Sequence, residues 1–184
     1  EKHNQVKPYE QGRYPRGINL ICDIKAETGL GQSARILAHM LQESEIPFTI
    51  IQISQTGQLA HSENEWDAYI EEKPRYDTNL IHVNMNEWPL KYCEIETSVF
   101  DYRRNIAYWL WELQTLPKQW LPCIDTVDEI WVPSEFICSC MRRYTEKRVV
   151  KIPYYIQIGE PLAYDRAYFG LEEDVFYYLF MYDF

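Results

Sequence analysis

Six short apolar runs, separated by longer amphipathic or polar stretches, constrain the fold of this chain more than any other feature. Each run spans four to seven residues and is nearly free of charge, as expected for strands that are buried on both faces of a sheet. The runs are Gly17–Asp23 (GINLICD), Pro47–Ile53 (PFTIIQI), Asn79–Asn84 (NLIHVN), Asn105–Trp111 (NIAYWLW), Glu129–Val132 (EIWV) and Val149–Ile152 (VVKI).

Two segments between these runs have the spacing of amphipathic helices. From Leu30 to Glu45, apolar residues recur at i, i+4, i+7, i+8 and i+11 and form one stripe. Ser134 is a favourable N-cap for a second helix, from Glu135 to about Tyr144. Its expected inward face consists of Phe136, Ile137, Cys140, Met141 and Tyr144. Strands that alternate with helices predict an α/β fold, a doubly wound, Rossmann-like, mostly parallel sheet with helices on both faces.

The chain divides into three parts by composition. Residues 1–16 are polar and contain Pro8, Gly12 and Pro15, which predicts a polar leader. Residues 17–165 hold the six runs and form the expected Rossmann-like domain, with 54–78 left unplaced apart from one short helix at most. Residues 166–184 turn through an acidic stretch into the apolar sequence VFYYLFMYDF, which we interpret as the first strand of a truncated second domain.

Charge and composition exclude several classes of function. A net charge of −10 argues against binding to nucleic acid, which requires a basic surface. The 15 Tyr and 6 Trp suit sugar ligands and serve equally as core residues. The five cysteines lack C-x-x-C spacing and are expected to be reduced in a cytoplasmic protein, with no metal site. No apolar run approaches eighteen residues, so we expect no transmembrane segment.

The loop after the first run carries the strongest local signal for a binding site. Gly29, Gly31 and Ala34 fit G-x-G-x-x-[GA] at a helix start, where backbone N–H groups and the helix dipole favour phosphate. The residues predicted to bind donor phosphate are Thr28, Gly29, Leu30, Gly31 and Gln32. On this interpretation, Gly31→Asp abolishes activity and leaves the protein folded. The alternative is that both glycines only turn the chain and pack the helix on the sheet.

Other candidate site residues lie at or just after the carboxyl ends of the third and fourth runs. Glu112 is a candidate catalytic base or acceptor of sugar hydroxyl hydrogen bonds, or else a carboxylate that complements the dipole of the next helix. Asn84 and Trp111 are candidates for contact with an acceptor, and Trp111 has a core role as its alternative. Two further predictions are that Arg103 with Arg104 forms a solvated pair, and that His82 is a core histidine with its hydrogen bonds satisfied.

Four stretches of the chain resemble the group 1 (family 4) glycosyltransferases of the GT-B fold. These are GINLICDIKAETGLGQSARILAHML (17–41), NIAYWLWEL (105–113), VDEIWVPSEFI (127–137) and GLEEDVFYYLFMYDF (170–184). The resemblance implies two Rossmann-like domains that face each other across a cleft. The N-terminal domain holds the acceptor and its glycine loop approaches the donor phosphates, while the C-terminal domain holds the nucleotide and an E-x7-E motif.

Residue by residue, the resemblance has matches and departures. Gly29, Gly31 and Gln32 match the glycine loop of the family. Glu112 falls near the position where many members place a catalytic-cleft histidine, which is absent here. The usual P-x-G turn after the sixth strand is altered, because Tyr155 stands where glycine is common.

The implied function is transfer of a hexose from a nucleotide sugar to a glycan or lipid-linked acceptor. Transfer would be retaining, metal-independent and without a cofactor, in a bacterial protein of the cytoplasm or the inner face of the membrane. The partner would be the missing C-terminal domain, without which the fragment is expected to be inactive. Two alternatives stay open: a non-catalytic Rossmann-like binding module, and a nicotinamide-dependent oxidoreductase. The second is disfavoured because Gly29 lies six residues after Asp23 and because Ile53-Ser54-Gln55 offers no acid for a ribose.

Overall fold

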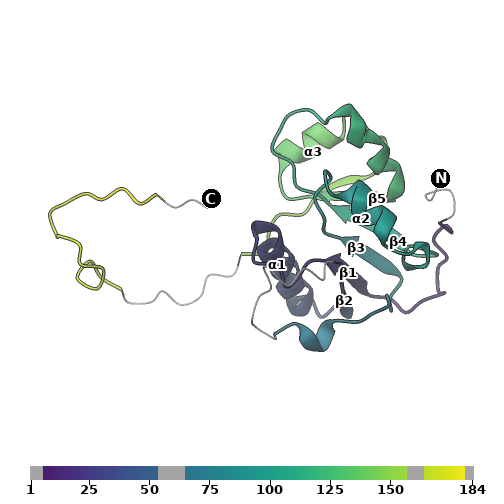
Figure 1. Cartoon of the computed structure of the whole chain (residues 1–184), viewed down its shortest axis with the longest axis horizontal. Helices are drawn as coiled ribbons and strands as arrows, with labels where there is room; N and C mark the ends of the chain where they lie inside the picture. Colours follow the sequence, from purple (N-terminus) through teal and green to yellow (C-terminus); the bar gives the residue numbers. More distant parts are fainter. Residues whose placement is uncertain (1–5, 54–64, 157–163, 181–184) are drawn as a thin grey trace.

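The computed structural model describes residues 6–53, 65–156 and 164–180 and contains a six-stranded, all-parallel sheet (Figure 1). Each of the six predicted runs forms a strand, so the α/β, Rossmann-like fold class is confirmed. The strands are β1 (Ile18–Cys22), β2 (Phe48–Gln52), β3 (Thr78–Ile81), β4 (Arg104–Tyr108), β5 (Glu129–Val132) and β6 (Val149–Lys151).

The order of the strands in the sheet is β2-β1-β3-β4-β5-β6. The chain therefore adds β2 on one side of β1 and all later strands on the other side. Such a reversal is a topological switch point, and α/β sheets bind ligands in the crevice outside the carboxyl ends of the strands at this point. Here the switch point lies between β1 and β3.

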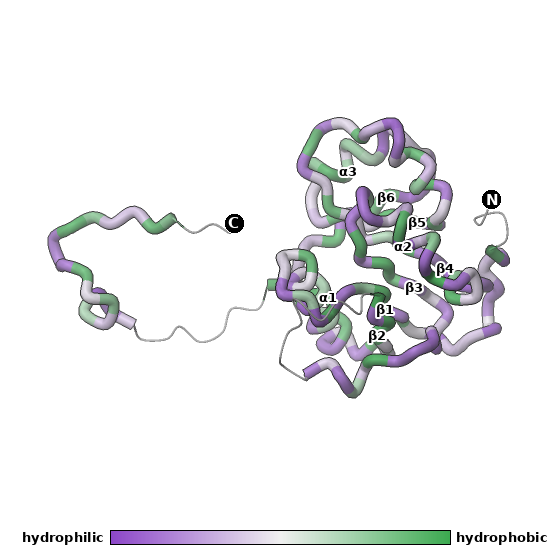
Figure 2. Tube along the Cα trace, in the orientation of Figure 1, coloured by the Kyte–Doolittle hydropathy of each residue, from purple (hydrophilic) through white to green (hydrophobic). Residues whose placement is uncertain are grey.

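Helices and their cores cover both faces of the sheet. On one face, the stripe of α1 (Gly29–Glu43) packs with Leu20 of β1 and Leu80 of β3 in one buried cluster. On the other face, α2 (Trp88–Glu94), α3 (Glu135–Met141) and the 3-10 helix η4 (Lys118–Thr126) share a second buried cluster with Ile81 and Ile130. Two further 3-10 turns are η2 (Asp67–Tyr69) and η3 (Thr97–Val99). Figure 2 shows how hydrophobic residues concentrate along the strands and the inner sides of the helices.

The predicted helices are largely confirmed, with one correction of a face. Ser134 caps α3, because its Oγ accepts a hydrogen bond from the Ile137 N–H at 3.3 Å. The expected inward position of Phe136 is wrong, since its side chain is 48% exposed while Cys138 is fully buried. Because α3 has only two turns, only one narrow side of it faces the sheet. Phe136 does not lie on that side. The short helix α2 was not predicted.

Three buried asparagines form a ladder across the middle of the sheet. Asn19, Asn79 and Asn105 occupy equivalent positions in β1, β3 and β4. The Asn19 amide donates to Asn79 Oδ1 at 2.9 Å, and the Asn79 amide donates to Asn105 Oδ1 at 2.8 Å. A slip of one strand by one residue would leave these amides buried and unpaired, so the ladder specifies the register.

Arg103 lies beneath the loops at the amino ends of the strands and contradicts the prediction of a solvated pair with Arg104. Arg103 is 4% exposed, and its guanidinium stacks on the Tyr14 ring at 3.8 Å. Desolvation lowers the pKa of Arg103 below its ordinary value. Its three guanidinium nitrogens donate to five carbonyl groups of two converging loops, which explains the burial. These carbonyls belong to Pro74, Tyr76, Ser98, Val99 and Asp101.

Residues 6–16, within the predicted polar leader, are fastened along the amino edge of the sheet. The Lys7 N–H donates to Asp101 Oδ1 at 2.8 Å, and the Lys7 carbonyl accepts from the Tyr102 N–H at 3.0 Å. Farther along, the Pro15 carbonyl accepts from the Asp77 N–H at 2.9 Å. This segment therefore forms a wall of the domain rather than a separate leader.

Residues 164–180 form a turn followed by irregular backbone, without a strand. The Arg166 guanidinium closes the turn by donating to the carbonyls of Glu172 and Val175 at 2.7 and 2.8 Å. Phe176 and Tyr178 are 77% and 92% exposed. The strand predicted here is not formed in the described part of the segment, because a strand needs a neighbour to pair with its backbone groups. Its assignment to a second domain stays a prediction.

We expect Asn79→Ala to lower the free energy of unfolding by about 3 kcal/mol, because it takes the donor from Asn105 Oδ1, removes one acceptor of the Asn19 amide and opens a cavity. Urea unfolding monitored by circular dichroism measures the change. The control is Gln119→Ala at an exposed position of η4, which should change the value by less than about 0.5 kcal/mol. A loss equal to that of the control would refute the role of the ladder.

Candidate functional site

The loop between β1 and α1 reaches the carboxyl edge of the sheet and is braced from two sides. At its root, the Gln52 side chain donates to the Asp23 carboxylate and accepts from the Ile24 N–H at 3.0 Å. From α1, the Arg35 guanidinium donates to the carbonyls of Ile24 and Ala26, both at 3.0 Å. Neither Gln52 nor Arg35 was singled out from the sequence, and both fix the backbone of the predicted phosphate loop.

Helix α1 begins in this loop and presents free amides at the surface. The Thr28 hydroxyl accepts from the Gly31 N–H at 3.1 Å, and the Thr28 carbonyl accepts from the Gln32 N–H at 2.9 Å. The N–H groups of Gly29 and Leu30 have no acceptor among the residues that the structure describes. Thr28 and Gly29 are exposed, so two donors and the positive end of the helix dipole face outward.

The two glycines of the loop have different roles. A side chain at Gly29 would meet nothing within 4 Å, which leaves room for a ligand beside its amide. A Cβ atom at Gly31 would lie 2.0 Å from the Ala26 carbonyl oxygen, so only glycine fits there. The structure therefore contradicts the expectation that Gly31→Asp leaves the protein folded. The packing interpretation holds for Gly31, and space for binding exists at Gly29.

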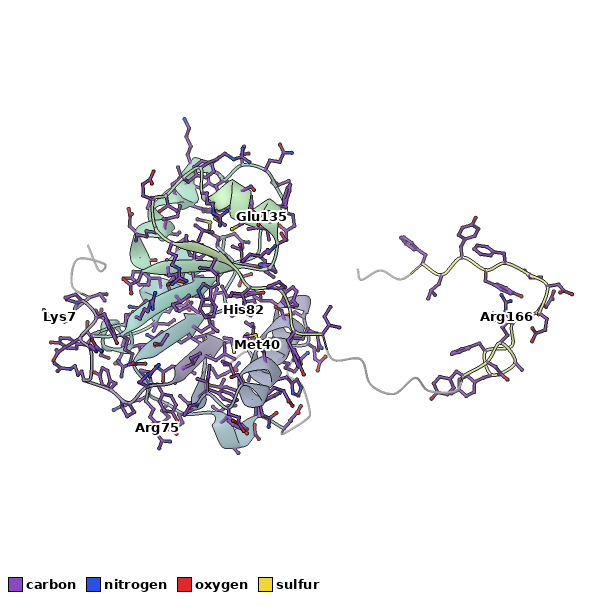
Figure 3. The ribbon with its side chains drawn as sticks, turned by 180° about the vertical axis from the view of Figure 1, so that it is seen from behind. Lys7, Met40, Arg75, His82, Glu135 and Arg166 are labelled. Carbon is purple, nitrogen blue, oxygen red and sulfur yellow. The ribbon has the colours of Figure 1, made fainter. Side chains whose placement is uncertain are left out.

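His82 lies under the start of α1 and carries an unpaired ring nitrogen (Figure 3). Its side chain is 1% exposed, and burial lowers the pKa of His82 to about 4, so the ring is neutral at pH 7. The ring also interacts with the backbone of Leu30. Because Nδ1 lies 3.1 Å from the carbonyl oxygen of Tyr108, it holds the proton and donates. Nε2 is then an acceptor without a donor in the described part of the chain.

Asn84, two residues after His82, carries a second unpaired acceptor. Asn84 Oδ1 is buried and has no hydrogen-bond donor among the described residues. The backbone carbonyl of Asn84 accepts from Glu87 and Trp88, both at 3.0 Å, which fixes the residue at the start of α2. Buried polar atoms without partners are uncommon and often mark sites of function. The prediction that His82 is a satisfied core histidine is correct for its burial and wrong for its Nε2 atom.

The segment after β6 packs against this same edge of the sheet. The Tyr154 hydroxyl accepts from Ser33 Oγ of α1 at 2.9 Å, and the Tyr108 hydroxyl donates to the Ile152 carbonyl at 2.9 Å. Burial raises the pKa of both tyrosines, which keeps these hydroxyls protonated. Tyr154 thus links the segment after β6 to α1.

Neither Glu112 nor Trp111 forms a hydrogen bond or a ring contact with the glycine loop among the described residues. Strand β4 ends at Tyr108, so Trp111 lies outside the strand in which the sequence placed it, and Glu112 does not follow the strand directly. Glu112 is exposed and has no partner in the described ranges. Trp111 donates to the Thr115 carbonyl at 3.0 Å and packs edge-on against Trp120, which supports its core alternative. Their roles in a reaction stay predictions.

The opposite edge of the sheet holds a cavity that the sequence did not predict. It has a volume of about 970 Å³ and lies at the amino ends of the strands, between them and residues 9–16. Its lining includes Arg16, Asp77, Thr78, Arg104 and Trp131. All five cysteines are free. The described residues hold no cluster of His, Cys, Asp and Glu suited to a metal ion, and none of their helices has the length and apolar character needed to cross a membrane.

Comparison with models of known protein families and with curated proteins gives no match to this chain. The site at the carboxyl edge is therefore argued from its own geometry. That geometry places the backbone of Leu30 against His82, and it leaves Thr28, Gly29 and Gln32 exposed at the start of α1.

Two glycine-to-alanine substitutions in the first turn of α1 should have different effects on the free energy of unfolding. Gly31→Ala is expected to lower the free energy of unfolding by about 2 kcal/mol, because the new methyl group overlaps the Ala26 carbonyl. Gly29→Ala should leave it unchanged or raise it by up to about 1 kcal/mol, because its Cβ enters open space. Thermal and urea unfolding measure both, and equal effects would contradict the assigned roles.

His82 should make stability depend on pH. Its folded-state pKa of about 4 lies below the unfolded value of about 6.5, so the unfolded chain binds more protons in that window. Stability is therefore lost as the pH falls from about 6.5 toward 4, by about 2 kcal/mol between pH 7 and pH 5. Urea unfolding at both pH values should show a smaller loss in His82→Gln. The control His39→Gln, at a half-buried histidine of α1, should keep most of the loss, and an unchanged loss in His82→Gln would refute the assignment.

Proposed function

We propose that this chain is the acceptor-side domain of a glycosyltransferase that moves a hexose from a nucleotide sugar to a glycan or lipid-linked acceptor. One observation carries the proposal: the free amides of Gly29 and Leu30 lie at the carboxyl edge above the unpaired Nε2 of His82. An anion suits the amides, and the neutral imidazole of His82 beneath them brings no charge of its own. The diphosphate of a nucleotide sugar is an anion of this kind.

The amides would act on the charge that builds on the departing diphosphate. Backbone dipoles that are fixed before the reaction stabilise such charge without reorganising, and Arg35 and Gln52 hold this loop in place. Retaining, metal-independent transfer would draw further positive charge from a facing nucleotide-binding domain, the partner that the resemblance implies.

His82 would support the start of α1 from beneath rather than remove a proton, because its side chain is 1% exposed. A neutral imidazole with a pKa of about 4 is also a weak base at pH 7, so it contributes little proton transfer. Proton removal is assigned to Glu112, whose exposed carboxylate is accessible to an acceptor. Closure of the facing domain over this edge would exclude water from the reaction.

The end of β2 supports this function over that of a nicotinamide-dependent dehydrogenase. Dinucleotide folds place an acid near this position to bind ribose hydroxyls. Strand β2 ends at Gln52, and the Gln52 side chain is bonded to Asp23 and Ile24 of the glycine loop. From Phe48 to Ile53, no acidic residue is present that could bind the ribose hydroxyls of NAD.

A binding module that retains the fold without the chemistry is the second candidate. Glu112 is exposed, and no residue in the described part of the chain forms a hydrogen bond or ion pair that would orient it, which favours this candidate. Both candidates bind a nucleotide, and only the transferase releases UDP or GDP from a nucleotide sugar when an acceptor is added. Screening the complete protein against a panel of donors and acceptors distinguishes them. The cytoplasm, or the inner face of the membrane, is the proposed location.

We expect UDP or GDP to raise the melting temperature of the complete protein more than NAD at the same concentration. Gly29→Asp should remove this shift, because it places a negative charge beside the free amides, and an acid at a helix start keeps the protein folded. The matched control, Gly29→Asn, has the same size without the charge and should keep the shift. A larger shift with NAD, or a full shift in Gly29→Asp, would overturn the proposal.

A further inference from the structure

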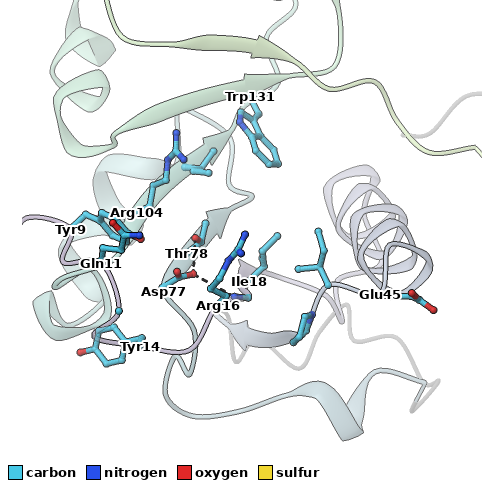
Figure 4. Close-up of a pocket in the computed structure, with 15 residues that line it drawn as sticks. Tyr9, Gln11, Tyr14, Arg16, Ile18, Glu45, Asp77, Thr78, Arg104 and Trp131 are labelled. Carbon is cyan, nitrogen blue, oxygen red and sulfur yellow. Dashed lines mark hydrogen bonds between the residues drawn. The ribbon is translucent and has the colours of Figure 1, made fainter.

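The cavity at the amino edge has the size and polarity of a ligand site (Figure 4). Its volume of about 970 Å³ lies within the range of small-molecule sites, which is roughly 300–1,000 Å³. It is walled by residues 9–16 on one side and by the first residues of β1, β3 and β4 on the other. The proposed transfer site is at the opposite ends of the same strands.

Arg16 supplies a charge that no residue of the described chain neutralises. Its side chain has no ion pair and no hydrogen bond within the described ranges, although it lines a cavity that also contains Asp77. Most other arginines in the domain are engaged: Arg104 pairs with Glu129, and Arg103 is bonded to backbone carbonyls. An unpaired guanidinium in a concave site is suited to bidentate binding of a carboxylate.

Trp131 supplies a fixed aromatic surface across the cavity from Arg16. Its indole N–H donates to Glu129 Oε1 at 2.8 Å, and Glu129 is itself buried beside Arg104 and Arg148. The ring is therefore held in one orientation while part of it stays exposed. Figure 4 shows the side chains of Arg16 and Trp131 extending toward each other. A rigid aromatic face binds the apolar side of a flat or ring-shaped ligand at low entropic cost.

Asp77 and Thr78 make the floor beside Arg16 polar. Asp77 Oδ1 accepts from the Gly17 N–H at 3.4 Å and from the Thr78 hydroxyl at 3.1 Å. These bonds occupy Oδ1, and Oδ2 keeps its capacity to accept from a ligand hydroxyl. A purely aromatic acid would cover Oδ2 without offering it a hydrogen-bond donor, which is costly. The floor therefore favours a ring that carries hydroxyl groups.

We propose that this cavity binds an acidic sugar of the hexuronate class. The carboxylate of the sugar pairs with Arg16, one face of its ring lies against Trp131, and a ring hydroxyl donates to Asp77. The site is independent of the proposed transfer function, because it is built from the amino ends of the strands and from residues 9–16.

Titration of the full chain with D-glucuronate, followed by saturation-transfer NMR and calorimetry, tests the proposal. Saturation transfer should appear on the ring protons of glucuronate. D-glucose, which has the same ring without the carboxylate, should bind at least tenfold more weakly. Arg16→Gln should weaken glucuronate binding at least tenfold without a change in melting temperature, because Arg16 makes no contact that stabilises the fold. The control Arg143→Gln, two residues after the end of α3, removes an equal charge and should leave binding unchanged.

Three results would overturn the proposal. The first is the absence of glucuronate binding at millimolar concentration. The second is equal binding by Arg16→Gln and the unchanged chain. The third is binding of benzoate as tight as that of glucuronate, which would assign the cavity to aromatic acids. Gly29→Asp should leave glucuronate binding unchanged, so the outcome is separate from that of the nucleotide experiment.

Discussion

The hydrogen-bonded ladder of Asn19, Asn79 and Asn105 is the interaction on which the rest of the domain depends. It aligns β1, β3 and β4 residue by residue, and that alignment decides which side chains meet at the two ends of the strands. The ends of the ladder also hold the neighbouring loops, because Asn19 Oδ1 accepts from two backbone amides and the Asn105 amide donates to two carbonyls. Polar groups buried in this way specify one register, because any other register leaves them unpaired.

The carboxyl edge follows directly from that register. Ile21 lies opposite Ile81, so the next residues in each strand place His82 beside the root of the glycine loop. The helix that grows from the loop then covers the histidine and lowers its pKa, which leaves a neutral ring with an unpaired acceptor. A polar site at this edge thus arises from two segments that are fifty residues apart in sequence and meet only through strand pairing.

The amino edge has a different origin. Residues 6–16 turn back along the sheet and pair with the loops before β3 and β4, where Arg103 neutralises converging carbonyl dipoles. The fold then leaves Arg16 and Trp131 facing a cavity rather than packed in the core. Sequence reasoning directed attention to the carboxyl ends, as the general rule for α/β sheets recommends. It gave no signal for this second edge, because the lining residues come from four strands and the segment before them.

The sequence by itself determined the six strands, the stripe of α1, the Ser134 cap and the position of the glycine loop, because each depends on local periodicity or on one short motif. Tertiary structure alone decided which glycine is needed for packing, which arginine is buried and which histidine nitrogen lacks a partner. Each of these depends on a carbonyl or a ring contributed by a distant segment: Ala26 against Gly31, the loops around Arg103, and Tyr108 beside His82. Local pattern specifies where the backbone forms strands and helices, whereas the chemistry of a side chain depends on neighbours that only the folded chain brings within bonding distance.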